Sequence, residues 1–365
     1  MESGVRSQES GVRSQESGVR SQESGVRSRI VGLDFVKGVT IFLVVFGHCI
    51  QYGNGKEYLS SGAFFDDILF KIIYSFHMPL FALVSGYLFY WSVSSRSPRE
   101  VLIRQANILV LPAVSWSILY QTAMAAFHIY RGDFDGVGVT LQRMYYGIYS
   151  LWFLWAMFYA SVIVLIVREK FRDSIKIYVL VSLLLTVSPN RFADSLYVFM
   201  FPYFAAGYLW HREGMDKKFS CANHKLLCAG IILVWCIMLL FYDRSSYIYT
   251  TGAKLIKYRE GIFVPFQLLT DIFRWCIGFA GCGAVLIFLK LIKPVKFIAA
   301  LGVKTLGIYI ISGYVFSLYM LHQEFPAAVY IMNFIQAVII TAVSYALSEG
   351  ISRVKILNKI FFGGR

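Results

Sequence analysis

The sequence predicts an all-α, polytopic membrane protein of about ten transmembrane helices with both termini in the cytoplasm. Hydrophobic residues make up 57% of the 365 positions and charged residues only 15%, whereas a soluble domain has about 25% charged residues. Long apolar runs recur along the chain, and the segments between them are alternately rich and poor in basic residues. Both features are typical of a chain that crosses the bilayer repeatedly.

Ten apolar runs approach the length of about 20 residues that a helix needs to cross the hydrocarbon core. The fifth and sixth runs lie closest together, because only the turn Ser188-Pro189-Asn190-Arg191 separates them. The predicted spans lie near residues 33–52, 68–91, 101–123, 148–167, 175–189, 194–211, 225–242, 263–289, 297–320 and 326–349.

Basic residues set the predicted orientation, because short cytoplasmic loops carry an excess of Lys and Arg. With the N-terminus inside, ten spans also return the C-terminus to the cytoplasm. The net charge of +14 then reflects topology and attraction to anionic lipid, and binding to nucleic acid is not needed to explain it. The basic residues on the predicted inner side are Arg96, Arg99, Arg104, Arg168, Lys170, Arg172, Lys176, Arg212, Lys217, Lys218, Lys225, Lys290, Lys293, Lys296, Arg353, Lys355, Lys359 and Arg365.

The first 28 residues are predicted to be a disordered segment outside the membrane domain. Residues 2–28 repeat Glu-Ser-Gly-Val-Arg-Ser-Gln three times and then give its first six residues once more. A short polar repeat of this kind cannot bury a core. The seven-base unit GAGTCAG, read through three frames, encodes this heptapeptide. We therefore expect a slippage tract that switches the gene on and off, the alternative being a longer repeat unit without a switching role.

The first span carries ionisable residues, which are functional-site hypotheses by default inside a bilayer. Asp34 and Lys37 lie at its start and His48 lies deep inside it. Asp34 and His48 are roughly 21 Å apart along a helix axis, so they cannot form a dyad within one straight span. Lys37 and His48 fall on nearly the same helical face. On this face Lys37 would place a positive charge near the cytoplasmic end of the span. His48 would place a neutral imidazole, which can accept a proton, deeper in the membrane.

The second and eighth predicted spans also contain polar or charged residues. The second span holds His77 and Ser85 around Pro79, and a proline at membrane depth frees a carbonyl that usually lines a cavity or packs on protein. Asp271 and Arg274, one turn apart in the eighth span, can pair on one helical face. Arg274 can act on a ligand or form an ion pair that only supports structure, and both roles stay open.

These patterns together resemble the acyltransferase-3 family of integral membrane O-acyltransferases, and within it the sugar O-acetylase branch most closely. The resemblance covers about residues 29–320. It departs in the ninth span, where Ile310-Ile311-Ser312 stands where the family commonly has a histidine after the tyrosine, so no role transfers there. The motifs that carry the resemblance are Arg29, Asp34, Lys37-Gly38, Gly47-His48, Phe76-His77-Met78-Pro79-Leu80-Phe81, Ser85-Gly86-Tyr87, Arg104 with Leu111-Pro112, and Leu301 to Tyr309.

The resemblance implies an acetyl-CoA-dependent enzyme with assigned residues. His48 would be the general base, and His77 would orient the acceptor or the thioester carbonyl. Arg29, Lys37 and Arg104 would bind the phosphates of the acyl-CoA. Supporting roles would fall to Asp34, Ser85, Asp271 and Arg274. For Arg274 the role would be to polarise the acyl carbonyl, to hold the acceptor or only to form an ion pair. The six cysteines show no metal-ligand or disulfide spacing, so we predict no metal site and no permanently bound cofactor.

The sequence therefore predicts a multi-pass enzyme of the bacterial inner membrane. It would move an acetyl group from cytoplasmic acetyl-CoA to a sugar hydroxyl of a lipid-linked surface glycan, O-antigen in the first place or capsule. The membrane domain would span residues 29–352 and a basic cytoplasmic tail 353–365, so the transfer would finish in this domain or on a separate protein. The alternative is a transporter or flippase of a lipid-linked oligosaccharide, although the two related halves common in transporters are not visible.

Overall fold

The computed structural model describes residues 31–190, 194–218, 224–318 and 329–364. Within them the chain is an all-α membrane protein, apart from a two-stranded hairpin of β1 (Ile256–Lys257) and β2 (Ile262–Phe263). Arg29 and the repeat of residues 2–28 lie outside the described part of the chain.

Six helices in the described residues are long and apolar enough to cross a membrane. A seventh candidate is the pair α14 (Lys296–Val303) and α15 (Thr305–Leu318), which is bent by 77° at Lys304. The six are the N-terminal helix (Val31–Tyr52), α3 (Ile68–Ser94), the continuous run Pro98–Arg131 of α4, η2 and α5, α7 (Trp152–Phe171), α13 (Phe266–Leu291) and α16 (Val329–Arg353).

Shorter helices occupy the remaining predicted runs. They are α8 (Ile175–Val187), α9 (Ser195–Arg212) and α11 (Lys225–Leu240). Each of the ten apolar runs therefore contains a helix, while six or seven helices meet the length and composition of a span. The small elements are α2 (Lys56–Ser61), η1 (Ala63–Asp66), α6 (Val137–Ile148), α10 (Met215–Lys218), η3 (Arg244–Ser246), α12 (Ile248–Thr251) and α17 (Lys355–Phe362).

Close glycine contacts pack the helices that carry the site. A Cβ on Gly86 of α3 would collide with the carbonyl oxygen of Phe204 in α9, and one on Gly207 would collide with that of Leu83. The N-terminal helix approaches α14 in the same way, where a Cβ on Gly38 would meet the carbonyl of Ile298. Small residues let helix backbones approach closely, which favours packing in a membrane. Helices α3 and α9 are therefore in close backbone contact.

The third predicted span is longer than expected and contains a π-helical turn. Pro112 lacks an N–H, so it cannot complete an α-helical bond to the carbonyl four residues earlier. The N–H of Leu111 bonds to Ala106 five residues back, and η2 (Ala106–Val110) is wound as a π-helix. Such turns are frequent at functional sites. The helix resumes as α5 (Leu111–Arg131) instead of ending near residue 123.

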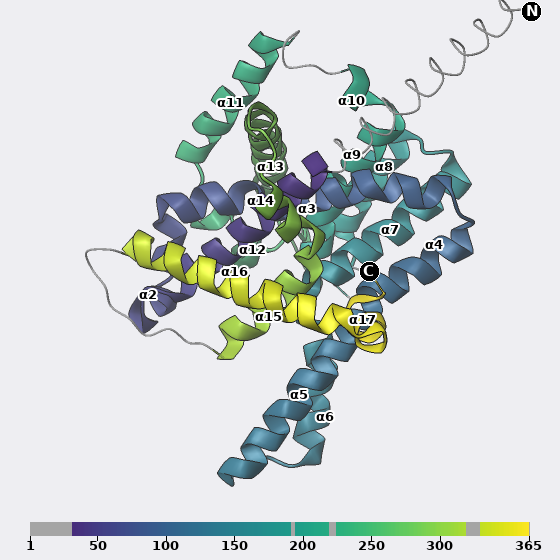
Figure 1. The fold of residues 1–365 in the computed structure, drawn as a ribbon. Helices are drawn as coiled ribbons and strands as arrows, with labels where there is room; N and C mark the ends of the chain where they lie inside the picture. The colour runs from purple at the N-terminus through teal and green to yellow at the C-terminus, as the bar shows by residue number, and fades with distance from the viewer. Residues whose placement is uncertain (1–30, 191–193, 219–223, 319–328, 365) are drawn as a thin grey trace, which may run out of the picture.

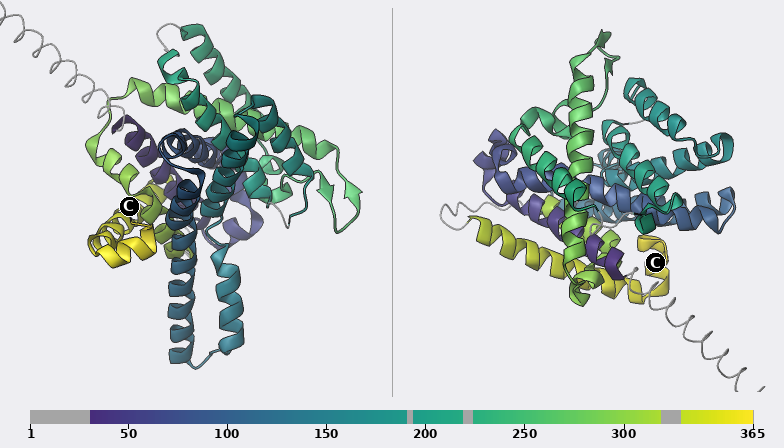
Figure 2. Two further views of the ribbon diagram at one scale, coloured as in Figure 1. Left: turned by 90° about the vertical axis from the view of Figure 1, so that its right-hand side faces the viewer. Right: turned by 90° about the horizontal axis from the view of Figure 1, so that it is seen from above.

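Helices α5 and α6 form an antiparallel hairpin that projects from the body of the molecule (Figures 1 and 2). The tail predicted at residues 353–365 folds back as α17 onto the base of α5. There the indole N–H of Trp116 donates to the carbonyl of Phe361 at 3.0 Å, and Phe362 is buried. The C-terminal segment is thus a packed helix over Lys355–Phe362, because its aromatic residues cover the side of α5.

Candidate active site

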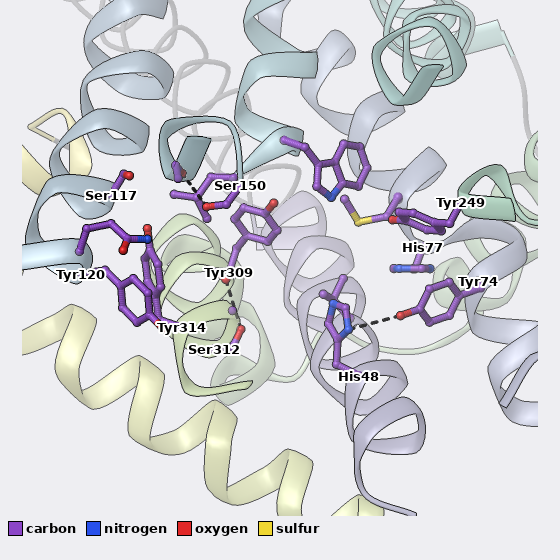
Figure 3. Close-up of a pocket in the computed structure, with 17 residues that line it drawn as sticks. His48, Tyr74, His77, Ser117, Tyr120, Ser150, Tyr249, Tyr309, Ser312 and Tyr314 are labelled. Carbon is purple, nitrogen blue, oxygen red and sulfur yellow. Dashed lines mark hydrogen bonds between the residues drawn. The ribbon is translucent and has the colours of Figure 1, made fainter. Parts of the chain in front are cut away.

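His48 and His77 line one cavity of about 280 Å³, which we call the histidine cavity (Figure 3). Its wall combines side chains from helices far apart in the sequence with the loop that contains α12. Most of the other wall residues are aromatic or carry a hydroxyl. They are Val44, Tyr74, Met78, Ser117, Tyr120, Gln121, Gly147, Ser150, Leu151, Trp152, Tyr249, Tyr309, Ser312, Gly313 and Tyr314.

The His48 ring is held through its Nδ1 atom. This nitrogen lies 3.3 Å from Oε1 of Gln51, one turn further along the same helix, and 3.4 Å from the hydroxyl of Tyr74 on α3. The single hydrogen of the Tyr74 hydroxyl is donated to Gln51 Oε1 at 3.4 Å, so the Tyr74 oxygen can accept from His48 Nδ1. An amide oxygen only accepts hydrogen bonds. The contact with Gln51 therefore favours the tautomer with a proton on Nδ1, which leaves a lone pair on Nε2.

The His77 ring has the same tautomer for a similar reason. Its Nδ1 atom lies 2.8 Å from the carbonyl oxygen of Ile73, and a carbonyl can only accept. The Nδ1 atom must carry the proton, so the Nε2 lone pair is available as an acceptor. Tyr74 packs edge-on against this ring with centroids 4.5 Å apart. One tyrosine thus contacts both histidines, and both imidazoles have a basic Nε2.

The rest of the wall suits a polyhydroxylated ligand. Trp152 and Tyr249 provide aromatic faces in this wall, and Ser312 adds a hydroxyl. Hydroxyl and amide groups come from the α5–α6 side, including Ser117, Gln121 and, just after α6, Ser150. Ligand cavities usually combine apolar and aromatic walls with a few polar groups that fix orientation.

A second cavity, of about 350 Å³, is lined by two basic residues, and we call it the basic cavity. Lys37 of the N-terminal helix, Ser85 of α3 and Arg104 of α4 all line it. The Lys37 ammonium is paired with Asp34 at 2.8 Å. The structure therefore brings the predicted coenzyme residues Lys37 and Arg104 together, with the two supporting residues Asp34 and Ser85 beside them.

The two cavities share part of their walls. Met78 of α3 and Tyr309 of α15 line both of them. On the N-terminal helix, Lys37 lines the basic cavity and His48 the histidine cavity, about 16 Å further along the axis at 1.5 Å per residue. Lys37 and His48 thus follow one another along the N-terminal helix, and His77 reaches the histidine cavity from α3.

Asp271 and Arg274 pair as the sequence predicts, with 3.0 Å between Nη1 and Oδ1, but they are not among the residues that line either cavity. Arg274 is 2% exposed. Its guanidinium donates to the backbone carbonyls of Ser245, Ser246, Tyr247 and Gly252 and to the Thr251 hydroxyl. Of the roles left open, the geometry supports the structural one.

The loop that Arg274 holds also carries one wall of the site. Asp243 begins this loop, and hydrogen bonds from Ser245 and Ser246 hold the pKa of its carboxyl below the ordinary value. Tyr247 is buried against Phe65, Phe70 and Tyr242, and Tyr249 lines the histidine cavity.

Sequence reasoning did not assign roles to several residues of the site. A role for Gln51 could have been predicted from the sequence, because a polar residue three positions after His48 shares its helical face. Tyr249 could not, since only the tertiary fold brings a loop residue near the first two spans. Among the described residues, no group of three or more His, Cys, Asp or Glu side chains could hold a metal ion.

Comparison with known proteins assigns the family. The sequence model of the acyltransferase-3 family, described as an acyltransferase domain, matches residues 30–353 of this chain. Nodulation protein NolL of Sinorhizobium fredii (strain NBRC 101917 / NGR234) is 29% identical over 302 residues, which cover 80% of this chain and 79% of that protein. Nodulation protein NolL of Mesorhizobium japonicum (strain LMG 29417 / CECT 9101 / MAFF 303099) is 26% identical over 306 residues, covering 81% and 79%. No solved structure matches the chain. The chain therefore belongs to the acyltransferase-3 family of membrane acyltransferases.

Proposed function

We propose that this protein is an O-acetyltransferase that moves an acetyl group from cytoplasmic acetyl-CoA to a sugar hydroxyl of a cell-surface glycan. The observation that carries the proposal is the shared wall of the two cavities. A cavity with Lys37 and Arg104 adjoins, at Met78 and Tyr309, a cavity with two imidazoles. A donor with phosphates and a thioester and an acceptor with hydroxyl groups would then meet at one junction.

In this account the basic cavity binds the donor. Lys37 and Arg104 supply positive charge for the phosphates of coenzyme A, Arg as a planar fork and Lys as a point charge. Arg29, just before the described residues, would add a third basic group. Asp34 holds the Lys37 ammonium at 2.8 Å, so it would set the position of that charge. The thioester would then extend toward Met78 and Tyr309.

The histidine cavity would carry out the transfer. His48 Nε2 removes the proton of the acceptor hydroxyl as its oxygen attacks the thioester carbon. The tetrahedral intermediate collapses with cleavage of the carbon–sulfur bond, and the proton passes from His48 to the thiolate of coenzyme A. The new carbon–oxygen bond is the acetyl ester. His77 Nε2 is also an acceptor, so it would orient the sugar through a second hydroxyl rather than polarise the carbonyl.

The acceptor that this cavity favours is a glycan, with O-antigen as the first candidate and capsule as the second. Trp152 and Tyr249 can stack on a sugar ring, while Ser117, Gln121 and Ser150 can exchange hydrogen bonds with its hydroxyls. A lipid-linked acceptor would already be at the membrane. The aromatic and hydroxyl lining of the cavity, together with the family, supports a glycan acceptor.

We propose a topology of ten spans in the bacterial inner membrane with both termini in the cytoplasm. The excess of basic residues in the predicted inner loops supports a cytoplasmic N-terminal end for the first helix. Lys37 then faces the cytoplasm, where acetyl-CoA is made, and His48 lies in the outer half of the membrane. The repeat at residues 2–28 would be the translated product of a slippage tract, so that synthesis of the enzyme switches on and off.

Glycan mass spectrometry tests the proposed function directly. Surface glycan is compared between cells with the gene in frame and cells with the gene out of frame. We expect the acetyl mass increment only in the first. Identical glycans in both strains would contradict an acetyltransferase, and loss of the whole glycan from the out-of-frame cell surface would support the transporter instead.

A further inference from the structure

Met78 and Tyr309 are the residues that the donor and acceptor cavities have in common. Met78 follows His77 on α3 and is 7% exposed. Tyr309 comes from α15, on the far side of the bend at Lys304. Figure 3 shows Tyr309 among the residues of the histidine cavity, and the same residue also lines the basic cavity. The two side chains therefore form the boundary between the cavities.

One side of this boundary is fixed. The Tyr309 ring packs edge-on against the ring of Phe153, near the start of α7, with centroids 6.0 Å apart. Within α15 the hydroxyl of Ser312 donates a hydrogen bond to the Tyr309 carbonyl at 3.3 Å. The tyrosine backbone is thus part of a helix, and its ring is packed against α7.

The other side of the boundary is adaptable. Methionine is unbranched and polarisable, so its side chain can follow the shape of a group that passes it. Its backbone is nevertheless fixed, because Met78 lies within α3 next to Pro79. A flexible thioether opposite a fixed ring can admit a small acyl group, whereas a longer chain would have to displace the ring.

We propose that Met78 and Tyr309 select the acyl group by size. This inference rests on the proposed function, since a donor bound at Lys37 and Arg104 must bring its thioester past these residues to reach His48. Discrimination by the shape of an apolar wall reaches about 10- to 200-fold for each methylene. The boundary would therefore favour acetyl over butyryl, which carries two more methylenes.

The test compares acyl donors in membrane vesicles that contain the full-length protein and its glycan acceptor. Rates of transfer are measured with acetyl-CoA and with butyryl-CoA, and the quantity of interest is their ratio. We expect Met78→Ala and Tyr309→Ala each to raise the butyryl-to-acetyl ratio by about tenfold or more. Met200→Ala is the matched control, because Met200 is 1% exposed in α9 and is not among the residues that line either cavity.

The possible results separate this inference from the proposed function. Absence of acetyl transfer by the unmodified protein would contradict the proposed function itself. Acetyl transfer with the same butyryl-to-acetyl ratio in all three variants would overturn size selection at the boundary. A variant at Met78 or Tyr309 that accumulates normally but transfers neither group would also overturn it, because the residue would then be needed for the reaction rather than for selectivity.

Discussion

The Arg274 cluster, made of Asp271, Arg274 and the loop from Ser245 to Gly252, and the histidine cavity are both buried polar sites. They differ in how many nitrogen atoms of the Arg274 guanidinium and of the two imidazoles are hydrogen-bonded to the protein. The Arg274 guanidinium donates to four backbone carbonyls, a hydroxyl and Asp271. The hydrogen bonds of His48 and His77 are all made through Nδ1. A buried polar group whose hydrogen bonds are satisfied supports structure, whereas a basic nitrogen directed at a cavity can act on a ligand.

The largest effect on stability should come from the Arg274 cluster. Arg274→Met leaves Asp271 buried without its cation, which destabilises a protein by about 3–5 kcal/mol. The loop from Ser245 to Gly252 loses its donors at the same time. Thermal unfolding of the detergent-solubilised protein should show a lower midpoint, and less protein should accumulate in the membrane. The double variant Asp271→Leu/Arg274→Met removes both charges and should recover part of the loss. A variant that accumulates normally yet is inactive would make Arg274 part of the reaction.

The next effect concerns the donor. Lys37→Ala or Arg104→Ala should raise the KM for acetyl-CoA, because phosphate contacts bind the ground state and the transition state alike. A hydrogen bond to a charged group contributes about 1.5–3 kcal/mol, so KM should rise roughly 10- to 100-fold with little change in kcat. Steady-state kinetics in vesicles gives both constants. Lys290→Ala, in the last turn of α13 and outside the lining of the basic cavity, is the control. An unchanged KM in both variants would place the donor elsewhere.

A smaller effect on kcat is expected from substitutions of Gln51, which change the orientation of the His48 ring but leave the base itself in place. Gln51→Leu removes the acceptor that favours the proton on Nδ1 but leaves the imidazole in place. A net hydrogen bond contributes about 1 kcal/mol, so kcat should fall roughly fivefold while the KM for acetyl-CoA stays the same. The substitution Gln51→Glu restores an acceptor and should recover kcat. A fall in kcat for Gln51→Glu as large as that for Gln51→Leu would argue against a positioning role.

The repeat should have no effect on the folded enzyme. A gene that begins near Arg27 with a new initiator methionine should give full activity in cells, because the repeat contains no apolar residue larger than valine. Deleting one seven-base unit should abolish the protein through a frameshift, and deleting three should restore it. Immunoblots and glycan analysis of the three strains measure this. Activity that survives the one-unit deletion would refute the slippage tract.

The sequence predicts the helices and the polar residues of the site better than the contacts between them. Apolar runs mark where helices lie, and His48, His77, Lys37 and Arg104 are conspicuous because ionisable groups are rare in membrane segments. The shared wall at Met78 and Tyr309 depends on how α3 and α15 pack, which local patterns do not encode. The extension of α5 and the packing of α17 also depend on tertiary contacts, such as those of Phe361 and Phe362 with Trp116.

The role of His48 as the general base of the histidine cavity is tested most directly by one measurement. Membrane vesicles receive isotope-labelled acetyl-CoA and glycan acceptor, and labelled glycan is quantified for His48→Ala at matched protein level. His128→Ala is the control, because His128 lies near the end of α5 in a pair with Asp133. Loss of a general base typically lowers the rate by about 10²–10⁴-fold. We predict that loss for His48→Ala and unchanged labelling for His128→Ala. Labelling at the unmodified rate in His48→Ala would contradict the central claim.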